Sequence, residues 1–379
     1  MDFAERLGKL PPYVIADIDE YTSKLAAQGK DLVRLDVGDP DFDTPEFIKE
    51  AANKYIHEEG LNAYSPYRGI PELRQAIADK VREEHGVEVD PEKEIIITPG
   101  SKHAIFSTLQ ASVNPGDSVL IGDPVYPMFR NVTLFCGGKP KSLPLREELD
   151  YSFRPEELRE ESKIAVLNFP NNPTGGVIEE KMLSEIAENT KGKLVIYDAA
   201  YDKITFDGYK APFPWACEEL RDNCIILGSF SKTYAMTGWR IGYVIARKET
   251  INRVLEVEKI SNSCTPMFLQ KACIDALEKG DESIRKMNLE YQKRRDALSG
   301  GLRKIGIKAN KPKGAFYIYA NVKEQGDSMA FAKKLIDHGV TCVPGIGFGP
   351  SGEGHVRFAL TEKVERIKTA VERIKGALK

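Results

Sequence analysis

The chain has 379 residues, of which 41% are hydrophobic and 29% charged, a composition that excludes a disordered chain and fits a folded protein of about two domains. Its 54 Lys and Arg residues are balanced by 57 Asp and Glu residues, so the formal charge is only −3. We therefore expect no nucleic-acid partner and no membrane partner, because no net positive charge would attract either.

The cysteines and histidines exclude several kinds of stabilised or metal-binding protein. Six cysteines are scattered without a C-x-x-C pair, which favours free thiols in the cytoplasm over a disulfide framework or a zinc cluster. The five histidines lack the spacing of metal ligands, so no metal is expected. Residues 1–10 carry charges instead of the apolar region of a secretion signal. No apolar run reaches about 18 residues, the length of a membrane span.

The N-terminal 45 residues end in a turn-rich segment, residues 37–45 (VGDPDFDTP), which we expect to be a functional loop. From about residue 90, short apolar runs alternate with helix-like stretches. The predicted strands are Ile95–Ile97, Val119–Ile121, Ile164–Leu167, Leu194–Tyr197, Cys224–Leu227 and Ile241–Ala246. Continuously apolar strands between helices indicate an α/β fold with a mainly parallel sheet sandwiched by helices. Ligands bind such sheets at the carboxyl ends of the strands.

The C-terminal part has a different pattern, which predicts a smaller α+β domain. A long helical stretch, Ile251–Leu298, is expected to connect into it. The further predicted elements are strands at Ala315–Tyr319 and His355–Ala359 and helices at Phe331–Leu335 and Val364–Leu378. We expect a large domain at 46–284 and a small domain formed by 1–45 and 285–379.

Lys232 is the most informative residue that follows a predicted strand. It lies in Gly228-Ser229-Phe230-Ser231-Lys232, directly after an apolar run. A lone lysine is usually a solvated surface group, but burial and a nearby cation would lower its pKa and make the amine nucleophilic. Ser229 and Arg240 could complete a phosphate site beside it.

Three other loops that follow strands carry polar groups suited to a ligand. Asp198 directly follows an apolar run, so its carboxylate needs either a structural partner or a bound cation. Asn172 lies in a turn held by flanking prolines, and it could be a rigid turn residue or a ligand donor. Residues 98–102 (TPGSK) lead into a helix, which is compatible with an ordinary helix start or a phosphate site.

Together, these loops match pyridoxal phosphate, which needs a lysine amine, an acid at its pyridinium nitrogen and donors for its phosphate. Competing motifs fail. Residues 345–349 lack the spacing of a dinucleotide-binding loop, residues 228–233 lack the glycine before the lysine of a P-loop, and there is no G-x-S-x-G sequence.

With these motifs, the chain resembles the class I/II pyridoxal-phosphate-dependent aminotransferases of the aspartate-aminotransferase-like fold (fold type I). The resemblance covers nearly the whole chain, and its most specific stretches are residues 229–233 (SFSKT) and 238–242 (GWRIG). The other matching stretches are residues 38–45, 64–73, 171–175, 198–201 and 355–358.

The resemblance implies a role for each residue around the cofactor ring. Lys232 would bond to the cofactor aldehyde and later move the proton on the substrate Cα. Asp198 would pair with the pyridinium nitrogen, and Tyr126 would stack on the ring. Tyr201 and Asn172 would hydrogen-bond the ring hydroxyl oxygen.

The resemblance also implies a phosphate site shared between two subunits. The backbone amides of Ser101 and Lys102 would bind the phosphate, with the side chains of Ser229 and Arg240. Tyr64 would reach the same phosphate from a partner subunit. A homodimer with shared active sites follows.

For the substrates, the resemblance implies an L-amino acid and a 2-oxo acid such as 2-oxoglutarate, used in a ping-pong cycle. Arg357 would bind the α-carboxylate as a bidentate pair, helped by Gly38 and Asn172. Lys102 is a candidate for binding a side-chain carboxylate, so aspartate or glutamate is the favoured donor. The alternatives are an aromatic, alanine or diaminopimelate aminotransferase. A β-lyase on the same fold and a non-catalytic module that senses amino acids also remain open.

Overall fold

The computed structural model describes residues 3–379, and its centre is a seven-stranded sheet with the strand order β2-β8-β7-β6-β5-β3-β4. The strands are β2 (Ile95–Thr98), β3 (Ser118–Asp123), β4 (Lys139–Pro144), β5 (Ile164–Asn168), β6 (Leu194–Asp198), β7 (Cys224–Ser229) and β8 (Gly242–Ile245). Strand β8 runs antiparallel to both of its neighbours, and the other pairs are parallel. The mainly parallel sheet predicted from the sequence is therefore present.

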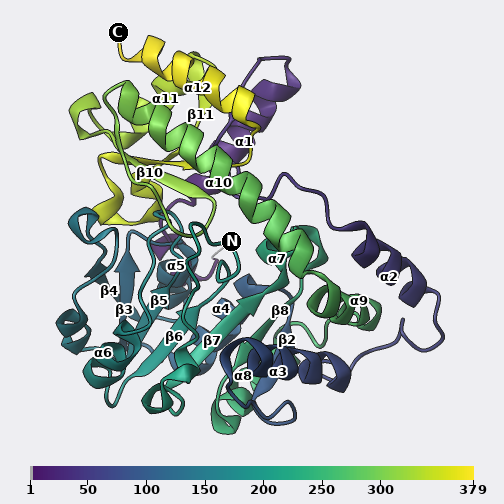
Figure 1. Cartoon of the computed structure of the whole chain (residues 1–379). Coiled ribbons are helices and arrows are strands. Elements are labelled where there is room, and N and C mark those ends of the chain that lie inside the picture. The colour runs from purple at the N-terminus through teal and green to yellow at the C-terminus, as the bar shows by residue number, and fades with distance from the viewer. Residues whose placement is uncertain (1–2) are drawn as a thin grey trace.

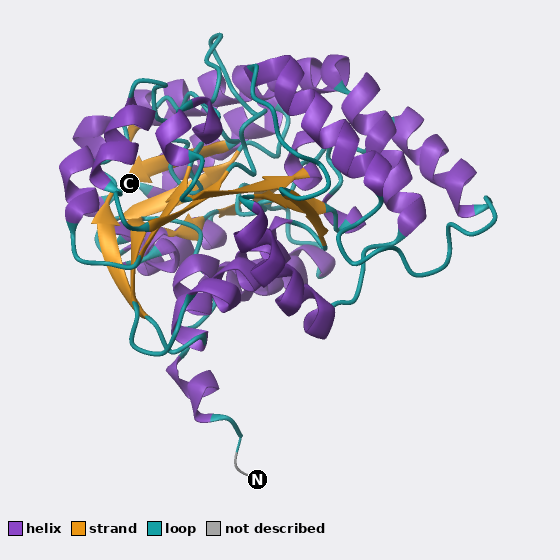
Figure 2. Cartoon of the chain, turned by 90° about the horizontal axis from the view of Figure 1, so that it is seen from below, coloured by secondary structure: helices purple, strands orange, loops and turns teal. Residues whose placement is uncertain are grey.

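Helices cover both faces of this sheet, as Figure 2 shows. Successive strand residues alternate between two apolar cores: Ile95 and Ile97 face one, and Ile96 faces the other. Helices α2 (Glu46–Ile56), α3 (Pro71–His85), α6 (Met182–Asn189) and α9 (Met267–Lys279) contribute to the first core. Helices α4 (Ser101–Ser112), α5 (Met128–Phe135) and α8 (Lys248–Ser261) contribute to the second. Burial on both faces explains why these strands are apolar throughout.

A smaller part is built from both ends of the chain (Figure 1). Its antiparallel sheet has the order β12-β13-β10-β9, and a parallel pair joins β1 to β11. The strands are β1 (Val33–Arg34), β9 (Lys308–Ala309), β10 (Tyr317–Asn321), β11 (Val340–Thr341), β12 (Val343–Pro344) and β13 (His355–Ala359). Helices α11 (Ser328–Asp337) and α12 (Val364–Ala377) pack there, and α1 (Val14–Ala27) lies nearby. The domain limits at 45/46 and 284/285 remain predictions.

The helical stretch predicted at 251–298 is three helices instead of one. Helix α8 ends at Ser261, α9 spans Met267–Lys279, and α10 spans Asp281–Lys304. Pro266 precedes α9 and Gly280 separates α9 from α10, which explains the two breaks. Helix α10 then runs from the large sheet into the smaller part (Figure 1), so a connector is present in this region.

The remaining helices within residues 3–379 are short. They are helix α7 (Phe230–Thr233) and 3₁₀ helices at Glu5–Lys9, Glu147–Leu149, Pro155–Arg159, Pro214–Ala216, Glu218–Leu220, Thr237–Trp239, Lys323–Gln325, Gly345–Phe348 and Pro350–Gly352. None of the described helices has the length and apolar character needed to cross a membrane.

Candidate active site

A cavity of about 440 Å³ lies at the carboxyl ends of β5, β6 and β7 and extends to α1 and to residues of the smaller part. Eleven of the twelve predicted site residues line it: Gly38, Ser101, Lys102, Tyr126, Asn172, Asp198, Tyr201, Ser229, Lys232, Arg240 and Arg357. Tyr64 is the exception, because its side chain is 88% exposed and lies outside this cavity. One chain therefore brings together every predicted group except the one that the resemblance assigns to a partner.

Lys232 extends into the cavity from α7, the single helical turn that follows β7. The Lys232 Nζ atom donates a hydrogen bond to the Gly38 carbonyl oxygen at 2.7 Å, and the same Nζ atom lies 3.9 Å from Asp39 Oδ1. Burial, together with the positive charges of Arg357 and Arg240, lowers the pKa of the amine to about 8 against the opposing effect of Asp39. Near neutral pH, more of this amine is therefore neutral and nucleophilic than in an ordinary lysine.

Asp198 is the last residue of β6, and its side chain is buried. Its Oδ1 accepts a hydrogen bond from the Ala200 amide at 2.9 Å. Burial raises the pKa of the carboxyl to about 7, because no cation within residues 3–379 offsets the loss of water. A carboxylate in this position favours a cationic ligand atom, which would bring its pKa back down.

Arg357, on β13, is buried at 1% exposure and faces the cavity. Its Nη1 donates to Asn172 Oδ1 at 3.0 Å, and its Nη2 donates to the Asp36 carbonyl oxygen at 2.8 Å. The Nε atom is buried without a hydrogen-bond partner, and no carboxylate among the described residues forms an ion pair with the guanidinium. The site therefore holds a preoriented cation that can accept an anionic ligand.

The loop between β2 and α4 forms a small cradle. Gly100 has a φ of +80°, and a Cβ on it would lie 2.6 Å from Arg240 Nη2. A Cβ on Gly242 would lie 2.6 Å from the Ser101 nitrogen. The two glycines keep open the space between the α4 N-terminus and Arg240, and this combination of backbone N–H groups and a guanidinium suits a phosphate.

These features fit pyridoxal phosphate at three separate points. The cradle suits its phosphate, the buried and unpaired Asp198 suits its protonated ring nitrogen, and the Lys232 amine suits its aldehyde. Tyr201 is also in place, and its hydroxyl shares a 2.8 Å hydrogen bond with the Tyr317 hydroxyl.

The cavity also has lining residues that were not predicted from the sequence, among them the polar residues Tyr13, Asp36, Asn168 and Tyr317. Asn168 had a usable signal, because it follows a predicted strand as Asp198 does and lies opposite Asp198 in the sheet. Tyr317 lies within a predicted strand, where it was indistinguishable from a core residue. Tyr13 and Asp36 come from the N-terminal segment, and no local pattern marks them. The Tyr13 hydroxyl donates to the Tyr126 hydroxyl at 3.1 Å, and Lys102 Nζ lies 5.4 Å from the centre of the Tyr13 ring.

Known proteins match this chain over most or all of its length. The family model "Aminotransferase class I and II" matches residues 30–374. An LL-diaminopimelate aminotransferase of Natranaerobius thermophilus is 37% identical and covers 99% of each chain. A probable aspartate aminotransferase of Methanocaldococcus jannaschii is 38% identical over 91% of this chain and 93% of its own.

Solved structures agree with this grouping. The aspartate aminotransferase of Thermus thermophilus with maleate superposes with a TM-score of 0.94 at 33% identity, covering 100% of both chains. The aromatic aminotransferase of Pyrococcus horikoshii superposes with a TM-score of 0.89 at 34% identity, covering 94% of this chain and 98% of its own. The fold is therefore that of the fold type I enzymes, and the chain belongs to the class I and II aminotransferases, which depend on pyridoxal phosphate.

Proposed function

We propose that this aminotransferase takes the amino group from an acidic L-amino acid, such as aspartate or glutamate, and passes it to a 2-oxo acid such as 2-oxoglutarate. The observation that carries the proposal is the pairing of two groups in one cavity. The buried Arg357 guanidinium has no carboxylate partner among the described residues, and the Lys232 amine has a lowered pKa. The Arg357 guanidinium can bind the α-carboxylate of an amino acid, and the Lys232 amine can act as the base that removes the proton from its Cα.

Bound pyridoxal phosphate supplies an electron sink for the charge that develops at the substrate Cα. Asp198 would hold the proton on the ring nitrogen, which would keep that sink effective. Tyr201 and Asn172 would hydrogen-bond the ring hydroxyl oxygen, and Tyr126 would pack against the ring. The Ser101 and Lys102 amides would hold the phosphate with the side chains of Ser229 and Arg240.

Arg357 binds the substrate carboxylate as a bidentate pair, which fixes the direction of the Cα–H bond. Asn172 and the backbone at Gly38 support the same end of the substrate. Lys232 Nζ would then act as the base that removes the Cα proton and, once protonated, as the acid that gives a proton back. A pKa near 8 serves both roles at neutral pH.

Lys102 supports a donor whose side chain ends in a carboxylate. Its side chain lines the cavity and lies 5.4 Å from the Tyr13 ring centre. Aspartate and glutamate carry such a group, and so does diaminopimelate at its far end. The names of the relatives support both choices, since they include LL-diaminopimelate and aspartate aminotransferases. Diaminopimelate is therefore the second candidate donor.

A steady-state comparison of amino donors with 2-oxoglutarate as the acceptor tests this proposal. We expect aspartate, glutamate or diaminopimelate to exceed alanine and phenylalanine in kcat/KM. Lys102→Ala should lower the ratio of aspartate to alanine turnover, and an unchanged ratio would contradict the role of Lys102. Release of pyruvate without an acceptor would indicate a β-lyase instead. Retained cofactor with no turnover of any donor would indicate a sensing module.

We further infer a cytoplasmic homodimer that shares its active sites. Tyr64 supports the dimer, because this large aromatic side chain is almost fully exposed and lies away from the cavity of its own chain. A second subunit that covered Tyr64 would bury it and place its hydroxyl at the partner's phosphate site. The six free cysteines support a reducing compartment.

A further inference from the structure

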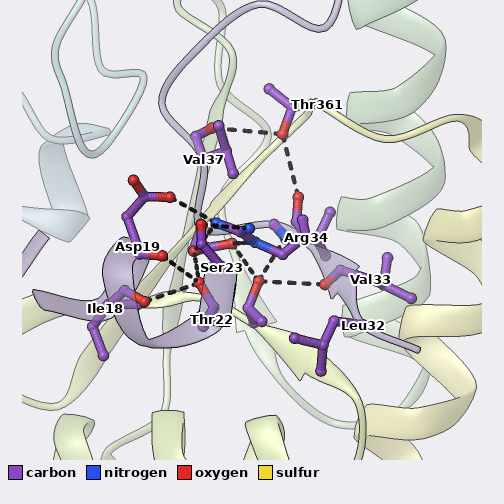
Figure 3. A network of polar contacts seen from close by, with 12 residues as sticks. Ile18, Asp19, Thr22, Ser23, Leu32, Val33, Arg34, Val37 and Thr361 are labelled. Carbon is purple, nitrogen blue, oxygen red and sulfur yellow. Dashed lines mark hydrogen bonds and ion pairs between the residues drawn. The ribbon is translucent and has the colours of Figure 1, made fainter. Parts of the chain in front are cut away.

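Asp36 has a buried carboxylate at the junction of α1, β1 and β11. Figure 3 shows polar contacts of this junction, with Thr22 of α1 and Arg34 of β1 labelled. Asp36 Oδ1 accepts hydrogen bonds from Arg34 Nε at 2.8 Å and from the Thr341 hydroxyl. Its Oδ2 accepts from Arg34 Nη2 at 2.9 Å and from the Thr22 hydroxyl at 2.8 Å. Both oxygens therefore face donors only, and the charge is balanced by a bidentate arginine.

The backbone of the same residue holds the proposed substrate-binding arginine. The Asp36 carbonyl oxygen accepts from Arg357 Nη2 at 2.8 Å. Asn172 Oδ1 is the other acceptor of the Arg357 guanidinium, at 3.0 Å. A shift of the backbone at Asp36 would therefore turn the guanidinium away from its present direction.

Helix α1 depends on this junction for its position. Only two residues of the helix are buried, Ile18 and Thr22, and Thr22 is the one that contacts Asp36. Arg34 adds a second tie, because its Nη2 also lies 2.7 Å from Asp19 Oδ1. With so little apolar burial, polar contacts supply much of what holds the helix in place.

Helix α1 and the residue before it also form one wall of the cavity. Tyr13, Ile15, Ala16 and Asp19 line it. The contacts thus run without a break from this wall through Thr22 and Arg34 to Asp36, and from Asp36 to Arg357.

We propose that Asp36 is a positioning residue that couples the α1 wall to Arg357. Its side chain fixes the wall, its carbonyl oxygen fixes the guanidinium, and an amino acid is bound tightly only when both are in place. The inference rests on the proposed role of Arg357 in binding the substrate carboxylate. It adds that a residue without substrate contact sets the affinity for the donor.

Asp36→Asn and Thr22→Val test the coupling in the holoenzyme. Asp36→Asn keeps the shape of the side chain but replaces one accepting oxygen with an NH₂ group. That group would face the hydrogen-bond donors that now bind the oxygen, so the contacts between α1, β1 and β11 at this junction should weaken. Thr22→Val removes the hydroxyl that donates to Asp36 Oδ2 and leaves a side chain of nearly the same shape. We expect each variant to raise the donor KM about tenfold, with kcat within about twofold of the wild type, because uniform binding is what is lost. Hydrogen exchange of residues 14–27 should become faster in both.

Two controls separate positioning from a general loss of stability. Thr22→Ser keeps the hydroxyl and should restore the wild-type KM. Asp31→Asn breaks the ion pairs of Asp31 with Arg366 and Arg373 in the same part of the molecule, and it should lower Tm without raising KM. Cofactor content should stay at the wild-type level in all four variants.

Several outcomes would overturn the inference. An unchanged donor KM in Asp36→Asn and Thr22→Val would do so, and so would a KM that rises equally in Asp31→Asn. If Asp36→Asn fails to fold, Thr22→Val decides alone. If the wild-type enzyme shows no saturable amino donor, the proposed function itself fails. If the wild type is active and the variants have the same donor KM, only the inference about Asp36 fails.

Discussion

At the scale of single residues, the site consists of charges that this chain does not neutralise by itself. Asp198 and Arg357 are both buried, and neither has an ion-pair partner among residues 3–379. Burial lowers the pKa of the Lys232 amine to about 8, so its charge is held less firmly than that of an ordinary lysine. Such groups destabilise the folded chain until a ligand of opposite charge arrives, so they mark the places where cofactor and substrate are expected.

The pKa of Asp198 leads to a prediction about the cofactor-free enzyme. The folded pKa of about 7 exceeds the ordinary value of 3.8, so between these values the folded state keeps a proton that the unfolded state releases. The free energy of unfolding therefore falls as the pH rises from about 4 to about 7, and it falls no further for this reason at higher pH. Asp198→Asn removes the effect and should stabilise the cofactor-free protein at pH 8, by on the order of 4 kcal/mol at most.

Urea unfolding of the cofactor-free wild type and Asp198→Asn at pH 5 and pH 8 measures this difference, which should be larger at pH 8. Asp31→Asn is the opposite control, because hydrogen bonds from Arg366 and Arg373 lower the pKa of Asp31 to about 2. That variant should lose stability at pH 8. The same Asp198→Asn protein should bind pyridoxal phosphate more weakly. If the Asp198→Asn protein is less stable than the wild type at pH 8, the raised pKa assigned to Asp198 is refuted.

Lys232 leads to a second prediction at the residue scale. Because the pKa of the amine is lowered to about 8, the rate of covalent attachment of pyridoxal phosphate to the cofactor-free protein should rise with pH and level off above about 8. Borohydride trapping at short times, followed by peptide mapping, measures the rate at each pH. The tag should lie on Lys232, should be absent in Lys232→Arg, and should persist in Lys141→Arg, which alters a half-buried lysine outside the cavity. A tag elsewhere in wild type, or a rate that keeps rising to pH 10, would contradict the assignment.

At the scale of elements, the site is made by short loops at strand ends, and this decided what could be predicted. Six strands were found because burial on both faces leaves continuous apolar runs. Strand β4 was missed because it alternates polar residues and has only Leu143 buried. Asp198, Asn172 and Lys232 were found because each follows an apolar strand or a rigid turn. Asp36 and Tyr317 reach the cavity only through tertiary packing of the smaller part, which leaves no local pattern in the sequence.

The cradle between β2, α4 and β8 gives a prediction at this scale. Gly242→Ala would place a Cβ 2.6 Å from the Ser101 nitrogen and 2.7 Å from the Gly100 carbonyl carbon, both of them backbone atoms that cannot move aside cheaply. The α4 N-terminus should shift, and the dissociation constant for pyridoxal phosphate should rise at least about tenfold. Titration of cofactor-free protein measures it.

Gly300→Ala is the matched control for that substitution. It makes the same change inside α10, where a new Cβ meets nothing within 4 Å. It should leave cofactor binding unchanged and add up to about 1 kcal/mol of stability, because alanine favours a helix over glycine. Equal cofactor affinity in Gly242→Ala and the wild type would show that the cradle does not hold the phosphate.

At the scale of the whole molecule, the cavity lies between a large sheet and a smaller part that carries Arg357, and one predicted group is missing from it. Tyr64 is 88% exposed, and on α8 Ile260 is 87% exposed. Large apolar side chains at this exposure are compatible with a surface that another molecule covers. A dimer that buried Tyr64 would complete each site with a residue of the other subunit.

Mixed dimers provide the decisive measurement of this arrangement. Lys232→Ala subunits are inactive but keep Tyr64, and Tyr64→Ala subunits keep Lys232 but should bind the cofactor phosphate weakly. If Tyr64 acts across the interface, each mixed dimer contains one complete site. Random reassembly of equal amounts at limiting pyridoxal phosphate should then restore about a quarter of the wild-type activity per subunit.

If Tyr64 instead served its own chain, no mixed dimer would contain a complete site, and mixing would restore nothing beyond the residual activity of Tyr64→Ala. Sedimentation of the wild type distinguishes this result from a monomer, in which no exchange of subunits could occur. Restoration therefore requires both a dimer and a tyrosine that crosses it.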